Sequence, residues 1–240
     1  MERFRKLFAG IICLSIGVFT LVSCNDDDPD PLQAIVDVMI QDIKTEEGVK
    51  YSVVIYATAN YELKSAKVTA PGAGGEVYNL TASADKRFFM FTPDEEDYTD
   101  ELPVKGDYTF ELTSLIDEKI TGKDVLGDED LEPIIIKTAA MNSQKLKTTW
   151  DKVDDADAYL VRLYTANKSE ILYSSNLLAS NQVEYEFGAA SSGWASGKSP
   201  VTDTNYLVEL WGVRFETGVT IDKANNVQFV TIDSKTIKWE

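Results

Sequence analysis

Histidine is absent from the 240 residues, and cysteine occurs only twice. Without an imidazole the chain cannot build a Ser-His-Asp triad, a Cys-His pair or a histidine metal site. Basic residues are scarce too, 23 against 40 acidic ones, which gives a formal net charge of −17. Because such a surface repels nucleic acid and anionic lipid headgroups, we expect no nucleic-acid partner.

Long hydrophobic runs are also scarce, and the longest lies at the N-terminus. Three basic residues precede an apolar run from Leu7 to Leu21, and small residues follow it. These are the parts of a secretory signal, and the run is shorter than the roughly 20 apolar residues that span a bilayer. Residues 1–23 are therefore predicted to be a signal peptide.

The apolar run ends at Leu21-Val22-Ser23-Cys24, which resembles a lipobox, the site where lipoprotein signal peptidase cuts before an acylated cysteine. The resemblance implies a lipid on Cys24. Ordinary secretion that leaves a free thiol is the alternative. The other cysteine, Cys13, lies inside the signal, so the mature chain has no disulfide and its stability must come from its core.

Residues 24–31, CNDDDPDP, form an acidic, proline-interrupted tether that cannot fold alone. The tether resembles the acidic export signal behind the lipidated cysteine in surface lipoproteins of the Bacteroidota. That resemblance implies a lipid-anchored protein of the outer membrane that faces the cell exterior. The alternative is a solvated linker that carries no export signal, on a protein that faces the periplasm.

Short runs of alternating hydrophobicity fill the rest of the sequence, with turn residues between them. Many short strands at regular spacing predict an all-β fold of consecutive sandwiches. We place the first, immunoglobulin-like, at residues 32–127, where segment 106–112 resembles the Gly-x-Tyr-x-Phe strand of bacterial immunoglobulin-like domains. Its strands are predicted to begin near Ile35, Val49, Leu63, Glu76, Arg87, Asp107 and Glu118.

The charged segment 128–132 predicts a linker, and residues 133–240 a second sandwich. Leu146-x-Thr148-x-Trp150 and the run 158–163 resemble strands B and C of a fibronectin type III domain, and segment 204–210 resembles its strand F with a tyrosine corner. The resemblance implies that Trp150 and the first tyrosine of strand C pack in the core. The sequence departs from the family pattern just before the corner.

Four side chains are candidates for ligand contact. If alternate residues face the core, then Trp211, Tyr164 and Arg162 share one exposed face of strands C and F, a platform for a sugar ring or a partner protein. A local stack of Arg162 on Trp211 that merely covers the sheet is the alternative. Trp194 lies in a Gly/Ser-rich stretch, where it either contacts a ligand or folds back on the sandwich as a plug.

Acid clusters supply the metal candidates. Asp94, Glu95 and Asp97 form one cluster, and Asp128 and Asp130 form another at the domain junction. Clustered carboxylates suit Ca²⁺, which takes six to eight oxygen ligands, so calcium is the one cofactor that the sequence leaves open. Solvated loops without any ion are the alternative.

These features predict a non-enzymatic surface lipoprotein that acts as a binding or adhesion module, with a glycan or a protein as partner. A structural accessory subunit of an outer-membrane complex is the second hypothesis. The third is a carboxylate-based glycan hydrolase, which needs two acids facing each other across a cleft. The acids of this sequence lie in predicted turns instead, which argues against it.

Lipidation of Cys24 can be tested by mass spectrometry of protein extracted from membranes. The mature chain is expected to begin at Cys24 and to carry the added mass of acyl chains. Cys24→Ser is expected to lose that mass and the membrane fraction. An unacylated Cys24 in the extracted protein would contradict the prediction.

Overall fold

The computed structural model describes residues 30–221 and 226–240. Within these ranges the chain is all-β, with the short 3-10 helix η2 (Glu95–Asp97) and no α-helix. Its strands form β-sandwiches, so the predicted fold class is confirmed. Among the described residues no helix has the length and apolar character needed to cross a membrane. The predicted signal peptide 1–23 and Cys24 lie outside the described residues.

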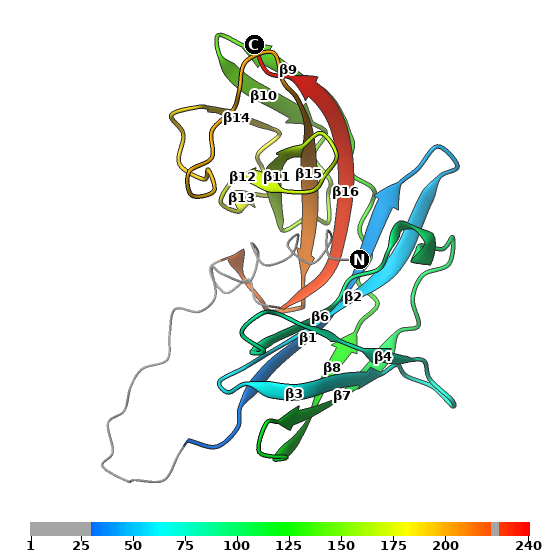
Figure 1. Cartoon of the computed structure of the whole chain (residues 1–240). Helices are drawn as coiled ribbons and strands as arrows, with labels where there is room; N and C mark the ends of the chain where they lie inside the picture. The colour runs from blue at the N-terminus through cyan, green and yellow to red at the C-terminus, as the bar shows by residue number, and fades with distance from the viewer. Residues whose placement is uncertain (1–29, 222–225) are drawn as a thin grey trace.

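The first lobe, residues 30–126, is a sandwich of two sheets (Figure 1). Its strands begin within one residue of the seven predicted positions, and one short strand was not predicted. The strands that join the large sheet are β1 (Ala34–Lys44), β2 (Val49–Ala59), β5 (Thr81–Ala82) and β6 (Phe88–Phe91). The smaller sheet, in spatial order, contains β4 (Val77–Asn79), β3 (Leu63–Thr69), β7 (Gly106–Ser114) and β8 (Lys119–Leu126).

The second lobe, residues 131–240, is also a sandwich. Its contribution to the large sheet is β11 (Ala158–Thr165), β12 (Ile171–Ser174), β13 (Leu178–Ala179), β15 (Asn205–Phe215) and β16 (Val227–Lys238). Its small sheet, in spatial order, contains β14 (Glu184–Gly188), β10 (Lys145–Trp150) and β9 (Ile136–Asn142).

One continuous nine-stranded sheet joins the two lobes. Its order is β12-β11-β15-β16-β1-β2-β6-β5, with β13 beside β11. The seam is a parallel pair of β16 and β1, in register from Ile40 opposite Phe229 to Ile43 opposite Ile232. Backbone hydrogen bonds therefore cross from one lobe to the other, which a pair of sandwiches joined only by a linker would not have.

The central strands of this sheet are buried on both faces. A first hydrophobic cluster fills both lobes on the side of the small sheets, from Leu32 to Trp239. A second cluster lies on the opposite face, around Met39, Val54 and Trp211. The alternation in β2 would leave one face for solvent, but six successive residues of β2 are buried. Burial on both faces is typical of strands at the centre of a sheet covered on each side.

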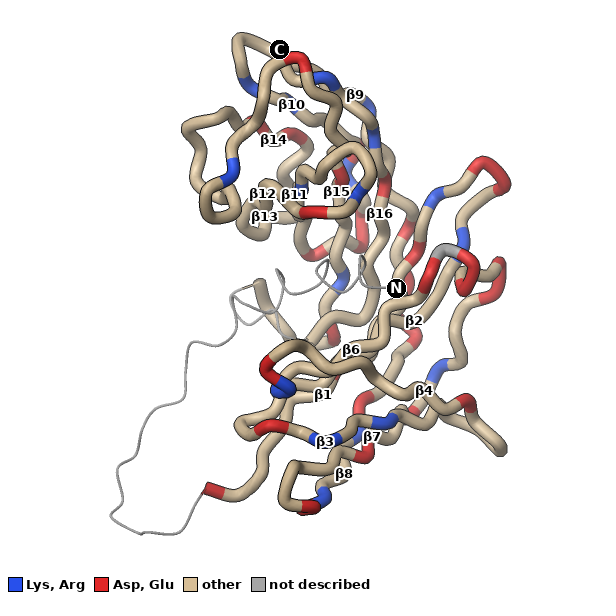
Figure 2. Tube along the Cα trace, viewed as in Figure 1, with Lys and Arg blue, Asp and Glu red and all other residues tan. Residues whose placement is uncertain are grey.

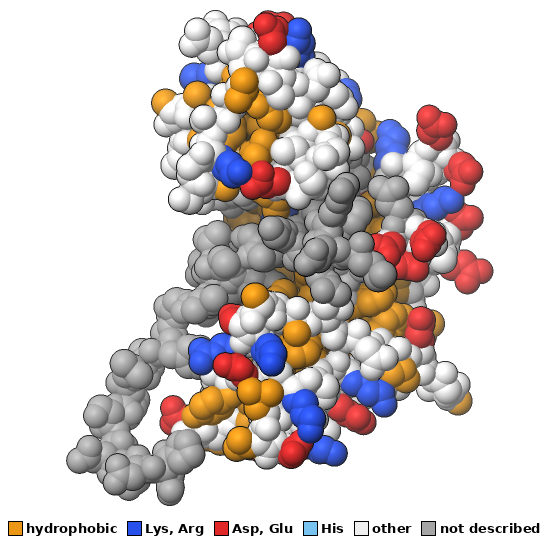
Figure 3. Space-filling model, in the orientation of Figure 1, with side chains coloured by type: hydrophobic (Ala, Val, Ile, Leu, Met, Phe, Trp, Pro, Cys, Tyr) orange, Lys and Arg blue, Asp and Glu red, His pale blue; other side chains and the backbone are white. Residues whose placement is uncertain are grey.

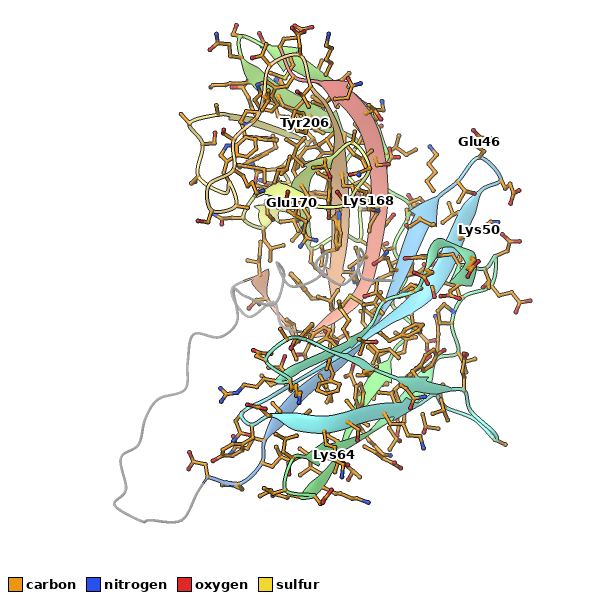
Figure 4. The ribbon with its side chains drawn as sticks, viewed as in Figure 1. Glu46, Lys50, Lys64, Lys168, Glu170 and Tyr206 are labelled. Carbon is orange, nitrogen blue, oxygen red and sulfur yellow. The ribbon has the colours of Figure 1, made fainter. Side chains whose placement is uncertain are left out.

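Each lobe contains a tyrosine whose hydroxyl is tied to the backbone a few residues upstream. The Tyr108 hydroxyl donates to the carbonyl of Val104 at 2.9 Å. The hydroxyl of Tyr206, on β15, accepts from the N–H of Val201 at 2.9 Å (Figure 4). Such tyrosine corners are a hallmark of immunoglobulin-like sandwiches. The second lobe therefore keeps this corner although its sequence departs from the family pattern there.

The B and C strands of the second lobe pack as the fibronectin resemblance implied. Trp150 ends β10 and lies edge to face against Tyr159 of β11, with ring centroids 5.4 Å apart. Both rings are buried. The chain thus has a fibronectin type III-like sandwich in its second lobe.

Asp42 lies buried at the seam, where one of its carboxylate oxygens accepts from the N–H of Ile232 at 3.2 Å. Burial raises the pKa of Asp42 to about 7, against the lowering effect of hydrogen bonds from Thr231 and Ile232. The folded state therefore binds a proton more tightly than the unfolded state does. Stability from this group is complete below about pH 4 and is lost as the pH rises through about 7.

Asp42→Asn should flatten this pH dependence, because an amide of the same shape does not ionise. We expect the loss of unfolding free energy between pH 4 and pH 8 to shrink by up to about 4 kcal/mol in the variant, measured by urea unfolding. Asp100→Asn, at an exposed position, is the matched control. A pH profile that Asp42→Asn leaves unchanged would refute the assignment.

Candidate binding site

A pocket of about 310 Å³ opens at the end of the shared sheet in the first lobe. It lies where the chain passes from the small sheet to the large one, between β4 and the terminal strand β5. We name it the edge pocket. The lining side chains that matter here are Asn79, Thr81, Phe88, Phe91, Asp94 and Asp97.

Local sequence explains why polar groups reach the edge pocket. Leu80 is buried and its N–H donates to the carbonyl of Ala66, which fixes the crossing point between the sheets. Its neighbours Asn79 and Thr81 are less buried than Leu80 and line the pocket. The crossing therefore places an amide and a hydroxyl side by side at the rim.

Aromatic rings form the apolar wall of the edge pocket. Phe91 packs on Tyr78 with ring centroids 4.9 Å apart, and Phe88 packs on Tyr56 at 6.1 Å. Both phenylalanines are half-buried and line the pocket, and they pack on opposite faces of β6. Figure 3 shows hydrophobic and charged side chains next to one another on the visible surface of the first lobe.

Carboxylates and a hydroxyl complete the lining. Asp97 caps η2, because its Oδ2 accepts from the N–H of Asp94 at 2.8 Å. The Asp94 side chain is exposed at the rim. Thr92 lines the same pocket, and its hydroxyl is buried without a hydrogen-bond partner within the described residues. Apolar rings beside a few convergent polar groups are the usual composition of a ligand site.

The structure does not assemble the predicted calcium ligands into one site. Asp94 and Asp97 lie at the edge pocket, and the side chain of Glu95 is outside what the structure describes. Asp128 pairs with a lysine at 3.4 Å, and Asp130 accepts from the next backbone N–H. In the described ranges one group of three carboxylates could surround an ion, and it contains none of these residues.

The predicted exposed platform of Arg162, Tyr164 and Trp211 is wrong. The three side chains do share one face of β11 and β15, with the guanidinium 4.3 Å from the centroid of the Trp211 ring, but all are fully buried. Trp211 belongs to the second hydrophobic cluster, which lies on this face of the sheet. The alternative, a local stack that covers the sheet, is confirmed.

A buried acid holds this stack in place. Glu209 accepts from the indole N–H of Trp211 at 2.9 Å and pairs with Lys168 at 2.6 Å. Lys168 lies in the turn between β11 and β12 (Figure 4). Because the Glu209 side chain is almost fully buried, its charge needs these partners. The cluster therefore has a structural explanation and offers no open surface to a ligand.

Trp194 folds back on the second lobe as a plug. Its ring lies 5.2 Å from that of Tyr173 and 5.9 Å from that of Trp239, and its indole N–H donates to the carbonyl of Gly188. Gly193 makes the approach possible, because a Cβ there would lie 2.4 Å from a backbone oxygen. Of the two roles predicted for Trp194, the structure shows the plug.

Sequence reasoning found only the acidic part of the edge pocket. Asp94 and Asp97 stood out as an acid cluster, but Asn79, Thr81 and Phe91 did not. These three belong to short strands whose sequence gives no sign of a change of sheet. The pocket exists because the chain turns that corner, which the alternation of side chains does not reveal.

No family model and no curated protein matches this chain. Solved structures that match this chain include proteins with fibronectin type III domains. A two-domain fibronectin type III segment of chicken tenascin has 11% identity, covers 77% of this chain and 91% of its own, and gives a TM-score of 0.30. Domains FN1–FN3 of chicken CNTN1 have 9% identity to this chain. The match covers 84% of this chain and 65% of the CNTN1 chain, with a TM-score of 0.29.

A tetra-tandem repeat from the extending region of a large adhesion protein gives 14% identity, with 86% of this chain and 50% of its own covered and a TM-score of 0.25. The fibronectin type III-like fold of the present chain is established by its own sheets and tyrosine corners.

Proposed function

We propose that this protein is a non-enzymatic, lipid-anchored binding module of the cell surface whose edge pocket binds a glycan. The observation that supports this proposal is the composition of the pocket. It is lined by the polar residues Asn79, Thr81, Asp94 and Asp97 together with the half-buried Phe88 and Phe91. Sugars present the complementary pattern, because their hydroxyls need donors and acceptors while their C–H faces pack on aromatic rings.

Charge favours a neutral glycan over an anionic one. Acidic residues gather on exposed loops, including the β1–β2 turn and the η2 segment (Figure 2). These two segments are neighbours, because Tyr51 and Thr99 exchange backbone hydrogen bonds. The carboxylates of Asp94 and Asp97 lie at the pocket itself. A sulfated or uronic-acid polymer would be repelled by this field, whereas a neutral oligosaccharide would not.

The shared sheet makes the module rigid. The pocket lies at the β5–β6 hairpin, which pairs with β2. Because β2 pairs with β1, and β1 pairs with β16 of the second lobe, the hairpin is fixed to the second lobe through the sheet. A site built on such strands loses little conformational entropy on binding. The acidic tether spans at most about 22 Å between Cys24 and Asp30, the first described residue.

Asn79→Ala should weaken glycan binding, since it removes an amide at the rim. We expect the affinity for a neutral oligosaccharide, selected from a panel by calorimetry, to fall about 3- to 10-fold, the value of one or two hydrogen bonds. Asn205→Ala removes an exposed asparagine of the second lobe and is the matched control. Equal affinities for both variants and the unaltered protein would place binding elsewhere.

If no oligosaccharide of the panel binds the unaltered protein, the glycan proposal is wrong. Melting curves of both variants should overlay that of the unaltered protein, because neither side chain is buried. This comparison separates a loss of binding from a loss of folding.

A second candidate function, that of an accessory subunit in an envelope complex, is favoured by the tip of the β7–β8 hairpin. Ile116 is 83% exposed there and Leu115 is 50% exposed, side by side. Adjacent aliphatic side chains on a projecting turn suit a protein interface.

The interface can be tested by pull-down from solubilised membranes with native mass measurement. Ile116→Ser should abolish a stoichiometric partner and leave the fold intact, because the side chain is outside the core. Val104→Ser, at another exposed aliphatic position, is the control. Retention of the same partner by Ile116→Ser would exclude this interface.

A further inference from the structure

Three carboxylates meet at the junction of the two lobes. Asp37 comes from β1, Asp124 from β8, and Glu216 from the segment that directly follows β15. Each contributes an oxygen to a group in which all three oxygens lie within 4.8 Å of one another. The first two residues belong to the first lobe and the third to the second lobe.

Backbone and amide donors hold the three side chains in this arrangement. Asp124 Oδ2 accepts from the N–H of Val38 at 2.7 Å, and Asp37 Oδ2 accepts from the N–H of Val227 at 3.4 Å. Glu216 Oε2 accepts from the side-chain amide of Asn226 at 3.2 Å. These donors fix the orientation of the group while they engage one oxygen of each carboxylate.

The second oxygens of two members have no such donor. Asp37 Oδ1 and Glu216 Oε1 are buried and have no hydrogen-bond partner in the part of the chain that the structure describes. Asp37 has an exposed fraction of 0%. Burying a carboxylate oxygen without a partner costs several kcal/mol of folding free energy, unless a group other than the described protein atoms pairs with it.

Electrostatics makes the arrangement unfavourable by itself. Burial raises the pKa of Asp37 well above its usual value, and the charges of Asp124 and Glu216 add to the increase, while the Tyr56 hydroxyl opposes it. Burial and Asp124 likewise raise the pKa of Glu216. Among the described ion pairs no lysine or arginine engages any of the three acids. The described lysines and arginines therefore supply no positive charge to the three acids.

We propose that Asp37, Asp124 and Glu216 bind a calcium ion that fastens the two lobes together. The ligand set is entirely carboxylate oxygen, which selects a hard cation over zinc or copper. Calcium accepts irregular coordination and both oxygens of one carboxylate, whereas magnesium requires a near-octahedral set. Three acids from separate segments, held by a strand pair and a turn, supply that irregular set.

This arrangement does not suit glycan hydrolysis. A catalytic acid must contact the substrate, but Asp37 has no exposed surface, and the edge pocket is lined by other residues. The ion would instead act on the fold. Through Glu216 it would bind the segment after β15 to β1 and β8 of the first lobe.

Terbium luminescence provides the direct test. Tyr56 lies opposite Asp37 on the adjacent strand, so a Tb³⁺ ion in the site should be sensitised by tyrosine excitation. We expect a saturable signal in the purified, chelator-treated protein that Ca²⁺ displaces, and its loss in Asp37→Asn. Asp94→Asn, which removes an exposed acid at the edge pocket, should retain the signal.

Thermal unfolding gives a second, independent readout. Calcium at about 100 times its Kd should raise the Tm of the unaltered protein by about 5–10 °C relative to chelator. In Asp37→Asn the Tm should be the same with and without calcium, and in chelator it should equal or exceed that of the unaltered protein, because a buried charge has been removed. Asp124→Asn replaces Asp37→Asn if the latter fails to fold.

Two results would overturn the proposal. One is a Tm of the unaltered protein that is the same in calcium and in chelator, which would mean that the acids are neutralised by shared protons. The other is a calcium-dependent shift that survives in both Asp37→Asn and Asp124→Asn. Neither result bears on the glycan proposal, which calorimetry at the edge pocket tests separately.

Discussion

The parallel pairing of β16 with β1 is the constraint on which the rest of the structure depends. In an ordinary tandem of sandwiches, a linker sets the angle between domains and the domains can move against each other. Here the pairing of Ile40–Ile43 with Phe229–Ile232 makes one sheet of two. The outer strand of each sandwich becomes a central strand, so neither lobe exposes an unpaired edge at the junction.

That pairing also changes which side chains are buried. Asp42 and Thr231, polar residues near the seam, lie in the interior because the lobes meet there. The acids at the junction are therefore a consequence of the shared sheet, and each requires a hydrogen-bond donor or a cation. The backbone N–H groups of Ile232 and Val38 act as donors to Asp42 and Asp124.

Local properties of the fold could be predicted from the sequence, and long-range ones could not. Alternation and turn residues located the strands of the first lobe, and Trp150 and Tyr159 identified the core of the second. The pairing of β1 with β16 joins residues about 190 positions apart, and no local pattern specifies it. The exposure of Trp211 was therefore predicted wrongly, since alternation indicates which face a residue occupies but not what packs on that face.

The same limit applies to the acid clusters in the sequence. Runs such as Asp94 to Asp97 are conspicuous because they are contiguous, and contiguous acids usually lie in solvated turns. Asp37, Asp124 and Glu216 are isolated in the sequence and inconspicuous, yet the fold brings them within 4.8 Å. In this fold the group is assembled from β1, β8 and the segment after β15. The acids most able to bind an ion are therefore those that the topology buries together, rather than those that the sequence clusters.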